Sequence, residues 1–389
     1  MSSDAFVIQA IRTPVGRRGG MLSGWHPVDL LAETLVGLVN RAGVDPSVID
    51  DVIVGCVDQV GEQSVNMARS AVLAAGFPET VPATTVDRQC GSAQQAAHFA
   101  AQGVMAGAYE VVIAAGVESM TRVPMWSNAL EATAPYGTRF RDRYDLGPDE
   151  FISQGLAGEI VAARWELDRA SLDAFALESH RKAASATKTG LFAQEMLPIP
   201  VEQNGDQVDM VADEGIRPNT TREALAELKP VFKEDGVLTA GNSSQISDGA
   251  AALLIVSESA AARLNLTPKV RFHSFALAGV NPVEMLTGPI PATRSVLERS
   301  GLALEDIDLF EINEAFASVP LAWARELDAD TSKLNVNGGA IAIGHPIGST
   351  GARLMTSLIH EMGRREARYG LQAMCEGGGI ANATILERL

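Results

Sequence analysis

The sequence predicts a layered α/β fold, because apolar runs typical of buried strands alternate with helical stretches along the chain. The runs are "FVIQAI", "DVIVGC", "EVVIAAG", "AALLIVS", "LFEIN" and "LQAMCEGGG". The helical stretches are Leu30–Ala42, Ala93–Ala106, Pro291–Ser300 and Gly351–Met362. Such alternation is typical of helices packed on a sheet, and 389 residues exceed what one hydrophobic core usually holds.

A faint internal repeat predicts that the fold is built from two similar halves. "RAGVDPSVID" (Arg41–Asp50) and "RSGLALEDID" (Arg299–Asp308) share Arg, Gly, Ile and Asp at the same offsets. In each half a Gly- and Ser-rich loop, a helix and an apolar strand ending in Gly follow: "QCGSAQQAA…VVIAAG" and "GHPIGSTGAR…LQAMCEGGG". The matching order of elements favours a duplicated half over chance.

The segment 121–247 between the halves differs in composition, since it is rich in charged residues and interrupted by prolines. "SNALEATAPYGTRFRDRYDLGPDE" is expected to be irregular, with helices following at Ala170–Thr189 and Thr221–Leu228. An inert insertion of this length is uncommon, so we expect a loop domain that holds a ligand. The first half then comprises residues 1–120 and about 248–268, and the second half comprises residues 269–389.

Charge and composition exclude several classes of function. A net charge of −17 with 46% hydrophobic residues is typical of a soluble globular protein and disfavours binding to nucleic acid or to anionic membranes. A polyanionic ligand must therefore meet a local patch of Arg, Lys or helix N-termini. No apolar run approaches the roughly 20 residues that span a bilayer. We recognise neither a signal peptide nor a peroxisomal address, and three cysteines predict no disulfide framework and a cytoplasmic location.

Cys90, in "VDRQCGSAQQ", is the first candidate for catalysis. A thiol at the start of a helix lies at the positive end of the backbone dipole, beside unpaired N–H groups, and both effects lower its pKa. Gly91 and Ser92 leave room for a substrate near the backbone. A single cysteine is more often a packing residue, so this stretch alone leaves both interpretations open.

Three further segments carry residues suited to catalysis. His345 lies in the glycine-rich "NVNGGAIAIGHPIGSTGARL" before a predicted helix, a setting that suits a base or an oxyanion donor. Cys375 ends an apolar strand and precedes glycines whose N–H groups can converge on an oxyanion, although a tight turn is an equal alternative. Asn313 and Glu314 follow the strand of "EINEAFASVP", at the edge of the sheet where ligand sites gather.

Taken together, each half supplies a thiol or an imidazole in a glycine-bearing loop at a strand end. Cysteine and histidine form an acyl-transfer pair, and a second thiol can serve as an acid or base. Zinc binding is the competing use of these residue types. The closely spaced ligand pairs of zinc sites do not occur in the sequence, so we expect no metal.

With these motifs in order, the sequence resembles the thiolases (acetyl-CoA acyltransferases) over nearly its whole length. The resemblance rests on "AIRTPVGRRGG", "VDRQCGS", "TAGNSSQISDGAAA", "EINEAFA", "NVNGGAIAIGHPIGSTGAR" and "CEGGG". "VDRQCGS", "LTGPIPATR" and "CEGGGIANATILERL" are most similar to the FadA6-type actinobacterial degradative thiolases of steroid-ring catabolism. The resemblance implies a five-layered αβαβα thiolase fold of two similar halves with an inserted loop domain, in a homodimer or homotetramer.

The resemblance also implies a role for each candidate residue. Cys90 would be the nucleophile that becomes acylated, His345 would activate it, and Cys375 would be the acid and base. Asn313 would hold a water that forms one oxyanion hole together with His345. The backbone N–H groups of Cys90 and Gly377 would form the second hole.

Coenzyme A is the implied co-substrate, and no permanently bound cofactor is expected. Arg217 and Ser244 match family positions that contact CoA, whereas Phe316 and Met285 match positions that line the acyl pocket. The implied reaction is thiolytic cleavage of a β-ketoacyl-CoA to acetyl-CoA or propionyl-CoA and a shortened acyl-CoA. It is reversible and would serve fatty-acid or steroid-ring degradation.

Three positions depart from the family pattern. "SQGLAGE" around Gln154 replaces a common "MGxTAE" segment, and Ala224 replaces a CoA-contacting serine. Glu376 stands where aliphatic residues are common, from which we expect a preference for a polar or carboxylated acyl chain. The alternative is that the Glu376 side chain points away from the substrate.

Other functions stay open at this point. They are a biosynthetic acetoacetyl-CoA thiolase, a carrier-protein synthase and a non-catalytic lipid-binding protein. A synthase would carry histidine in place of Cys375, and a lipid-binding protein would have lost a catalytic residue. If Cys90 and Cys375 face the same reacting carbon, we expect oxidation to join them in an inhibitory disulfide.

Overall fold

The computed structural model describes residues 4–129, 135–147, 150–203 and 205–389. Its strands are β1 (Ala5–Arg12), β2 (Gly16–Arg17), β3 (Asp51–Gly55), β4 (Ala83–Val86), β5 (Val111–Ser119), β6 (Ile199–Gln203), β7 (Asp206–Met210), β8 (Ser247–Ser257), β9 (Val270–Gly279), β10 (Leu309–Ile312), β11 (Tyr369–Glu376) and β12 (Ile380–Arg388). A ten-stranded sheet has the order β10-β11-β12-β9-β1-β8-β5-β3-β4, with β2 paired to β8, while β6 and β7 form a separate pair.

The helices lie on both faces of the large sheet. They are α1 (Pro27–Ala42), α2 (Met67–Ala74), α3 (Ser92–Met105), α4 (Thr138–Tyr144), α5 (Gln154–Arg164), α6 (Arg169–Lys188), α7 (Arg222–Ala226), α8 (Glu258–Arg263), α9 (Pro289–Ser300), α10 (Ser318–Leu327), α11 (Ala340–Ile343) and α12 (Thr350–Arg365). No described helix is long and apolar enough to cross a membrane.

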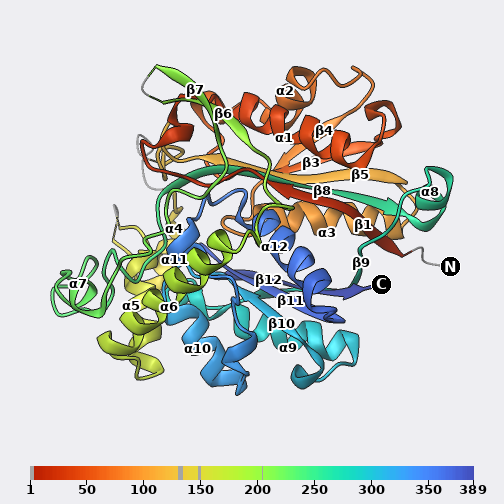
Figure 1. Cartoon of the computed structure of the whole chain (residues 1–389). Coiled ribbons are helices and arrows are strands. Elements are labelled where there is room, and N and C mark those ends of the chain that lie inside the picture. The colour runs from red at the N-terminus through yellow and green to blue at the C-terminus, as the bar shows by residue number, and fades with distance from the viewer. Residues whose placement is uncertain (1–3, 130–134, 148–149, 204) are drawn as a thin grey trace.

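The large sheet is divided into two leaves where β1 pairs with β9 over only two residue pairs. The first leaf holds β1, β3, β4, β5 and β8, and the second holds β9 to β12. Helices α3 and α12 lie between the leaves, α1 and α2 cover the outer face of the first, and α9 and α10 cover that of the second (Figure 1). The layers therefore follow the order αβαβα, and the predicted fold class is confirmed.

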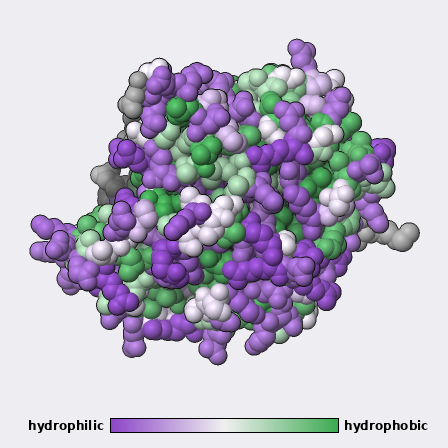
Figure 2. Space-filling model, viewed as in Figure 1, coloured by the Kyte–Doolittle hydropathy of each residue, from purple (hydrophilic) through white to green (hydrophobic). Residues whose placement is uncertain are grey.

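The alanine-rich helix α3 explains how the two leaves come close together. Ala93, Ala96, Ala97, Ala100 and Ala101 are all fully buried in the hydrophobic cluster between the leaves. Small side chains allow a helix to approach its neighbours closely while excluding water. At the surface, hydrophilic residues cover most of the face in view, and apolar residues occur in small groups among them (Figure 2).

Each apolar run that predicted a strand lies in a strand of the structure, and each of the four helical stretches lies in a helix. The run "EVVIAAG" became β5, which is buried along its whole length. Strands β9 and β12 were not among the predicted strands, because polar side chains interrupt their apolar residues. The segment expected to be irregular contains α4, and residues 130–134 and 148–149 within it lie outside the described residues.

Candidate active site

Cys90 lies in a tight turn between β4 and α3. Gln89 has a φ of 49°, in the left-handed region that few side chains adopt. The Ser92 hydroxyl fastens the turn, because it donates to the Gln89 carbonyl at 2.6 Å and accepts the Arg88 N–H at 2.8 Å. Since α3 begins at Ser92, the Cys90 sulfur is held beside the N-terminus of that helix.

Burial controls the acidity of the Cys90 thiol. It raises the pKa of Cys90 well above the ordinary value, and the nearby Cys375 and Glu376 raise it further. A backbone N–H at this turn does lower the pKa, but the cost of removing the thiolate from water outweighs it. Cys90 is therefore a thiol at neutral pH, and it needs a base before it can act as a nucleophile.

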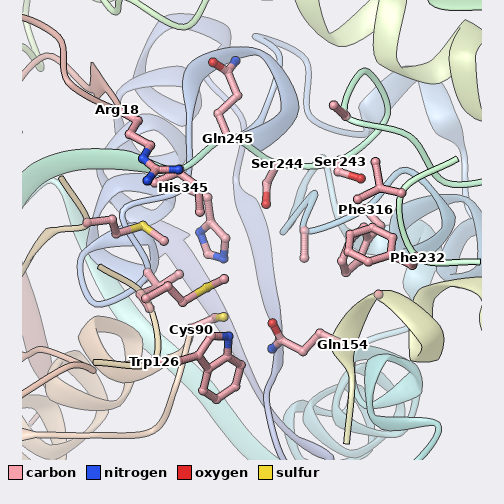
Figure 3. Close-up of a pocket in the computed structure, with 18 of the residues that line it drawn as sticks. Arg18, Cys90, Trp126, Gln154, Phe232, Ser243, Ser244, Gln245, Phe316 and His345 are labelled. Atoms are coloured by element: carbon pink, nitrogen blue, oxygen red, sulfur yellow. The ribbon is translucent and has the colours of Figure 1, made fainter. Parts of the chain in front are cut away.

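His345 is held in the form that such a base requires. Its Nδ1 lies 2.7 Å from the Thr350 hydroxyl, and that hydroxyl donates its hydrogen to the Pro346 carbonyl at 2.8 Å. The hydroxyl must therefore accept from Nδ1–H, which leaves Nε2 unprotonated and able to accept a proton. Burial lowers the pKa of His345 to about 3, so the ring is neutral. Figure 3 shows it next to Cys90 in the same cavity.

The loop that carries His345 is tied to the first leaf by the buried carboxylate of Glu118, near the end of β5. The carboxylate accepts hydrogen bonds from Gly348 N (2.9 Å), Val57 N (2.9 Å), Asp58 N (3.2 Å) and Gln63 Nε2 (2.6 Å). A Cβ at Gly348 would lie 2.5 Å from Glu118 Oε2, so only glycine allows this approach. Burial raises the pKa of Glu118 to about 7.

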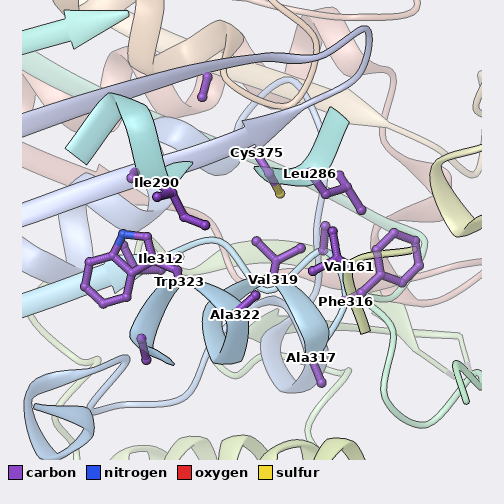
Figure 4. Packing of buried hydrophobic residues seen from close by; sticks show 14 of the residues in the cluster. Val161, Leu286, Ile290, Ile312, Phe316, Ala317, Val319, Ala322, Trp323 and Cys375 are labelled. Atoms are coloured by element: carbon purple, nitrogen blue, oxygen red, sulfur yellow. The ribbon is translucent and has the colours of Figure 1, made fainter. Parts of the chain in front are cut away.

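The side chain of Asn313 contacts both His345 and Cys375. Its Nδ2 lies 3.4 Å from His345 Nε2 and 3.9 Å from Cys375 Sγ, and its side chain is fully buried. Burial raises the pKa of Cys375 to about 12, so this group is also a thiol at neutral pH. Figure 4 shows its sulfur directed into the apolar cluster that contains Leu286 and Val319.

A cavity of about 1060 Å³ contains part of the predicted site in its wall. Cys90, His345, Arg217, Ser244 and Phe316 line it. Within it, Phe316 meets Phe232 edge to face with ring centroids 5.5 Å apart. Arg17 and Arg18 join Arg217 in the lining, which supplies the local positive charge that a polyanionic ligand requires in an acidic protein.

The other predicted residues lie outside the wall of this cavity. Cys375 and Asn313 are buried behind it. Gly377 begins the hairpin between β11 and β12, where a Cβ would lie 2.9 Å from Gln89 Oε1, so it adjoins the turn of the nucleophile. Met285 is packed in the same hydrophobic cluster as Phe316 and does not line the cavity.

Glu376 points away from the cavity, as the alternative interpretation had it. A Cβ on Gly91 would lie 1.8 Å from Glu376 Oε1, so the carboxyl group rests on the backbone next to Cys90. Adjacent residues of a strand face opposite sides, and Cys375 already faces the site. The expectation that Glu376 meets the acyl chain is therefore not supported.

Sequence reasoning missed Thr350, Glu118, Trp126 and Arg18. Thr350 could have been found as a hydroxyl residue shortly after His345. Glu118 could have been found as a single glutamate near the end of an apolar strand. Trp126 and Arg18 have no comparable local pattern. The three cysteines are free, so the expected disulfide stays a prediction. Among the described residues, no cluster of His, Cys, Asp or Glu could hold a metal ion.

Comparison with known proteins gives family matches along almost the entire chain. The model "Thiolase, N-terminal domain" matches residues 5–259, and "Thiolase, C-terminal domain" matches residues 266–388. The "Steroid 3-ketoacyl-CoA thiolase FadA6" of Mycobacterium tuberculosis is 48% identical over 395 residues, covering 100% of this chain and 95% of that protein.

Two solved structures are similar to this chain over its whole length. The Bacillus anthracis acetyl-CoA acetyltransferase has a TM-score of 0.91 and 41% identity, covering 100% of this chain and 99% of that one. Human mitochondrial 3-ketoacyl-CoA thiolase in complex with CoA has a TM-score of 0.90 and 38% identity, covering 100% and 98%.

Proposed function

The chain belongs to the thiolase family, and we propose that it is a degradative thiolase that cleaves a 3-ketoacyl-CoA with coenzyme A. One observation carries the proposal: Asn313 is within reach of both His345 Nε2 and Cys375 Sγ, while His345 shares a cavity wall with Cys90. A base, a nucleophile and a second thiol are thus available at one point. The name of the 48% identical relative supports a place in steroid or fatty-acid degradation.

In the first half-reaction His345 Nε2 accepts the proton of the Cys90 thiol. The thiolate attacks the 3-keto carbon, and the bond between carbons 2 and 3 breaks. The released enolate of acetyl-CoA or propionyl-CoA takes the proton of Cys375, whose high pKa keeps it protonated until then. His345, now carrying hydrogen on Nε2, and a water held by Asn313 stabilise the enolate oxygen.

In the second half-reaction coenzyme A collects the acyl group. The Cys375 thiolate takes the proton of the CoA thiol, and the CoA sulfur attacks the thioester on Cys90. The N–H groups of Cys90 and Gly377 hold the oxyanion of the tetrahedral intermediate. Cys90 then leaves as a thiolate and recovers the proton from His345, so that the enzyme returns to its starting state.

The acidic chain needs a cationic site for the CoA phosphates, and Arg17, Arg18 and Arg217 in the cavity lining supply it. Ser244 offers a hydroxyl in the same lining. The cavity of about 1060 Å³ has room for coenzyme A beside Cys90.

Assembly into a homodimer or homotetramer is part of the proposal. Strand β4 is the last strand of the sheet, and an edge strand of this kind readily pairs with another chain. Phe99 and Val65 are also exposed, by 43% and 89%. Light scattering during gel filtration measures the mass directly.

A cytoplasmic location is consistent with three unpaired cysteines.

The mass of the intact protein after incubation with a 3-ketoacyl-CoA tests the reaction. We expect an adduct with the mass of the shortened acyl group, located on Cys90 by peptide mapping and absent in Cys90→Ala. Cys56→Ala is the matched control, because Cys56 is also buried and free but contacts Glu118 and does not line the cavity, and it should keep the adduct. An adduct on Cys375 in the wild type would overturn the assignment of the nucleophile.

A further inference from the structure

Gln372 is a fully buried residue of β11 whose side-chain amide contacts two other elements near the site. Its Nε2 donates to the Gly351 carbonyl at 2.8 Å and to Gln94 Oε1 at 2.9 Å. Gly351 belongs to the first turn of α12, and Gln94 belongs to the first turn of α3. One amide group therefore joins β11 to the N-terminal turns of both helices that lie between the leaves (Figure 1).

These three elements hold the three groups of the proposed reaction. Cys90 directly precedes the first turn of α3. Thr350, which accepts the hydrogen bond of His345 Nδ1, is the first residue of α12. Cys375 lies in β11, the strand of Gln372. A shift of any one element relative to the others would therefore change the separation of the nucleophile, the base and the second thiol.

The two helices are in backbone contact at this point. A Cβ on Gly351 would lie 2.4 Å from the backbone N atom of Gln94, which is closer than real Cβ contacts allow. Only glycine therefore lets the first turn of α12 approach the first turn of α3 so closely. The amide of Gln372 thus bonds to both helices at the place where they touch, and a change in this link acts directly on their spacing.

The orientation of both amide groups follows from their partners. The Gly351 carbonyl can only accept, so Gln372 presents its nitrogen to it, and Gln94 must present its oxygen to that same nitrogen. Gln94 Nε2 in turn donates to the Thr384 hydroxyl at 2.7 Å and to the Gln372 carbonyl at 3.4 Å. His98 Nε2 lies 2.7 Å from the same hydroxyl, and burial lowers the pKa of His98 to about 3. The network is therefore uncharged and has one consistent arrangement of donors and acceptors.

Stability alone is a weak reason for this network. Burial of amide groups costs desolvation, and Gln372 Oε1 has no hydrogen-bond partner among the described residues. Two apolar side chains of similar length would fill the same space without an unpaired polar atom. Hydrogen bonds are directional, however, and weaken steeply when their partners move apart. A buried network of this kind is therefore better suited to fixing a spacing than to adding stability.

We propose that Gln372 and Gln94 are positioning residues, which hold Cys90, His345 and Cys375 at the separation that the reaction requires. This role rests on the proposed thiolase reaction and adds two residues that act through the elements they join. Neither side chain is among the described residues that line the cavity. A misplacement of about 1 Å far from the chemistry can slow an enzyme about 100-fold, so a loosened link should slow the reaction without weakening the binding of coenzyme A.

Variants with methionine at both positions test the proposal. Methionine keeps the length of each side chain, and the double variant Gln94→Met/Gln372→Met leaves no unpaired group between the two positions, so it should unfold in urea near the wild-type midpoint. We expect kcat and the rate of Cys90 acylation by a 3-ketoacyl-CoA to fall about tenfold. The Kd of coenzyme A, measured by calorimetry, should change by less than about twofold.

The single variants show which link matters. Gln372→Met removes the bonds to both helices, whereas Gln94→Met leaves the bond to Gly351 in place. We therefore expect Gln372→Met to be the slower of the two. The double variant should be no slower than Gln372→Met, because the two side chains share one link.

Val104→Ala is the matched control for a general loss of stability. Val104 is buried in the same cluster between the leaves, near the other end of α3. Removal of its methyl groups should lower the urea midpoint, while kcat should stay within about twofold of the wild type. A fall in kcat equal to that of Gln372→Met would show that destabilisation explains the effect, and it would overturn the positioning role.

The remaining outcomes separate the two proposals. A folded double variant with the kcat of the wild type would overturn the positioning role and leave the thiolase reaction intact. If the double variant does not fold, a slower Gln94→Met than Gln372→Met would overturn it in the same way. Failure of the wild type to acylate Cys90 with every 3-ketoacyl-CoA would overturn the thiolase proposal itself.

Discussion

The ends of β5 and β11 occupy corresponding places in the two halves, and each carries a buried glutamate next to a catalytic segment. Glu118, near the end of β5, accepts hydrogen bonds from three backbone N–H groups, the Gln63 amide and the Cys56 thiol, and ties down the loop of His345. Glu376, at the end of β11, is equally buried, but neither of its oxygens is within good hydrogen-bond geometry of a described residue, and only the Arg88 charge and the nearby Asn382 N–H oppose the effect of burial. Glu118 therefore anchors a segment of the site and Glu376 does not, although both carboxyl groups raise the pKa of Cys90, Glu376 more than Glu118.

The comparison shows that hydrogen bonding, and not residue type, decides what a buried carboxyl group does. A carboxylate that satisfies several buried N–H groups is costly to remove, because the donors are left without acceptors. A carboxyl group without partners is costly to keep, because burial disfavours its charge. Replacing the two glutamates should therefore change stability in opposite directions.

Removal of Glu118 should have the largest effect. Glu118→Leu leaves the buried backbone N–H groups of Val57, Asp58 and Gly348 without an acceptor, so we expect the free energy of unfolding in urea to fall by about 4 kcal/mol. We also expect kcat to fall about 100-fold, because the His345 loop loses its tether. The exposed Glu110 just before β5 gives a control, since Glu110→Leu should change stability by less than about 0.5 kcal/mol. Equal stabilities of the two variants would show that Glu118 is not an anchor.

Replacement of Glu376 should act in the opposite direction. Glu376→Met removes an unpartnered buried carboxyl group at similar volume, so we expect stability to rise by about 2 kcal/mol. The pKa of Cys90 should fall, because Glu376 contributes to raising it. Iodoacetamide should then alkylate Cys90 faster than in the wild type at a fixed pH. A loss of stability would instead indicate that Glu376 has a favourable partner.

The pH dependence of stability sharpens the same contrast. Burial raises the pKa of Glu376 well above its ordinary value of 4.5, so the folded protein retains a proton that the unfolded chain releases. Its contribution to stability is complete below pH 4.5 and declines as the pH rises toward the folded-state pKa. The stability gap between Glu376→Met and the wild type should therefore widen from pH 5 to pH 8 in urea unfolding. A constant gap would count against the raised pKa.

The smallest effect is expected at the hydrogen bond that orients His345. Thr350→Val removes the acceptor for Nδ1–H, so we expect about a tenfold lower kcat and a stability loss of about 1 kcal/mol. Thr350→Ser should restore most of the rate. Because the pKa of His345 is lowered to about 3, its neutral form persists on acidification, and kcat/KM of the wild type should show no decline due to His345 between pH 8 and pH 5.

Much of the fold and of the site followed from local pattern. Apolar runs gave β1, β3, β5, β8, β10 and β11, since buried strands leave a signal within a few residues. Cys90, His345 and Cys375 stood out because each lies beside glycines, and Asn313 because it follows an apolar run. Strands β9 and β12 were missed because polar side chains interrupt their apolar residues, so that only their pairing with each other, between distant segments, identifies them.

The sequence by itself determined which segments carry chemistry and, through its resemblance to the thiolases, the fold in which they meet. Only the tertiary structure decided how the groups behave there: that burial raises the pKa of Cys90, that Glu376 faces Gly91, and that Glu118 holds the loop of His345. The reason is that desolvation and hydrogen bonding depend on atoms brought together from distant positions. Glu118 and Gly348 are 230 residues apart in the chain, and no local pattern records that one accepts a hydrogen bond from the other.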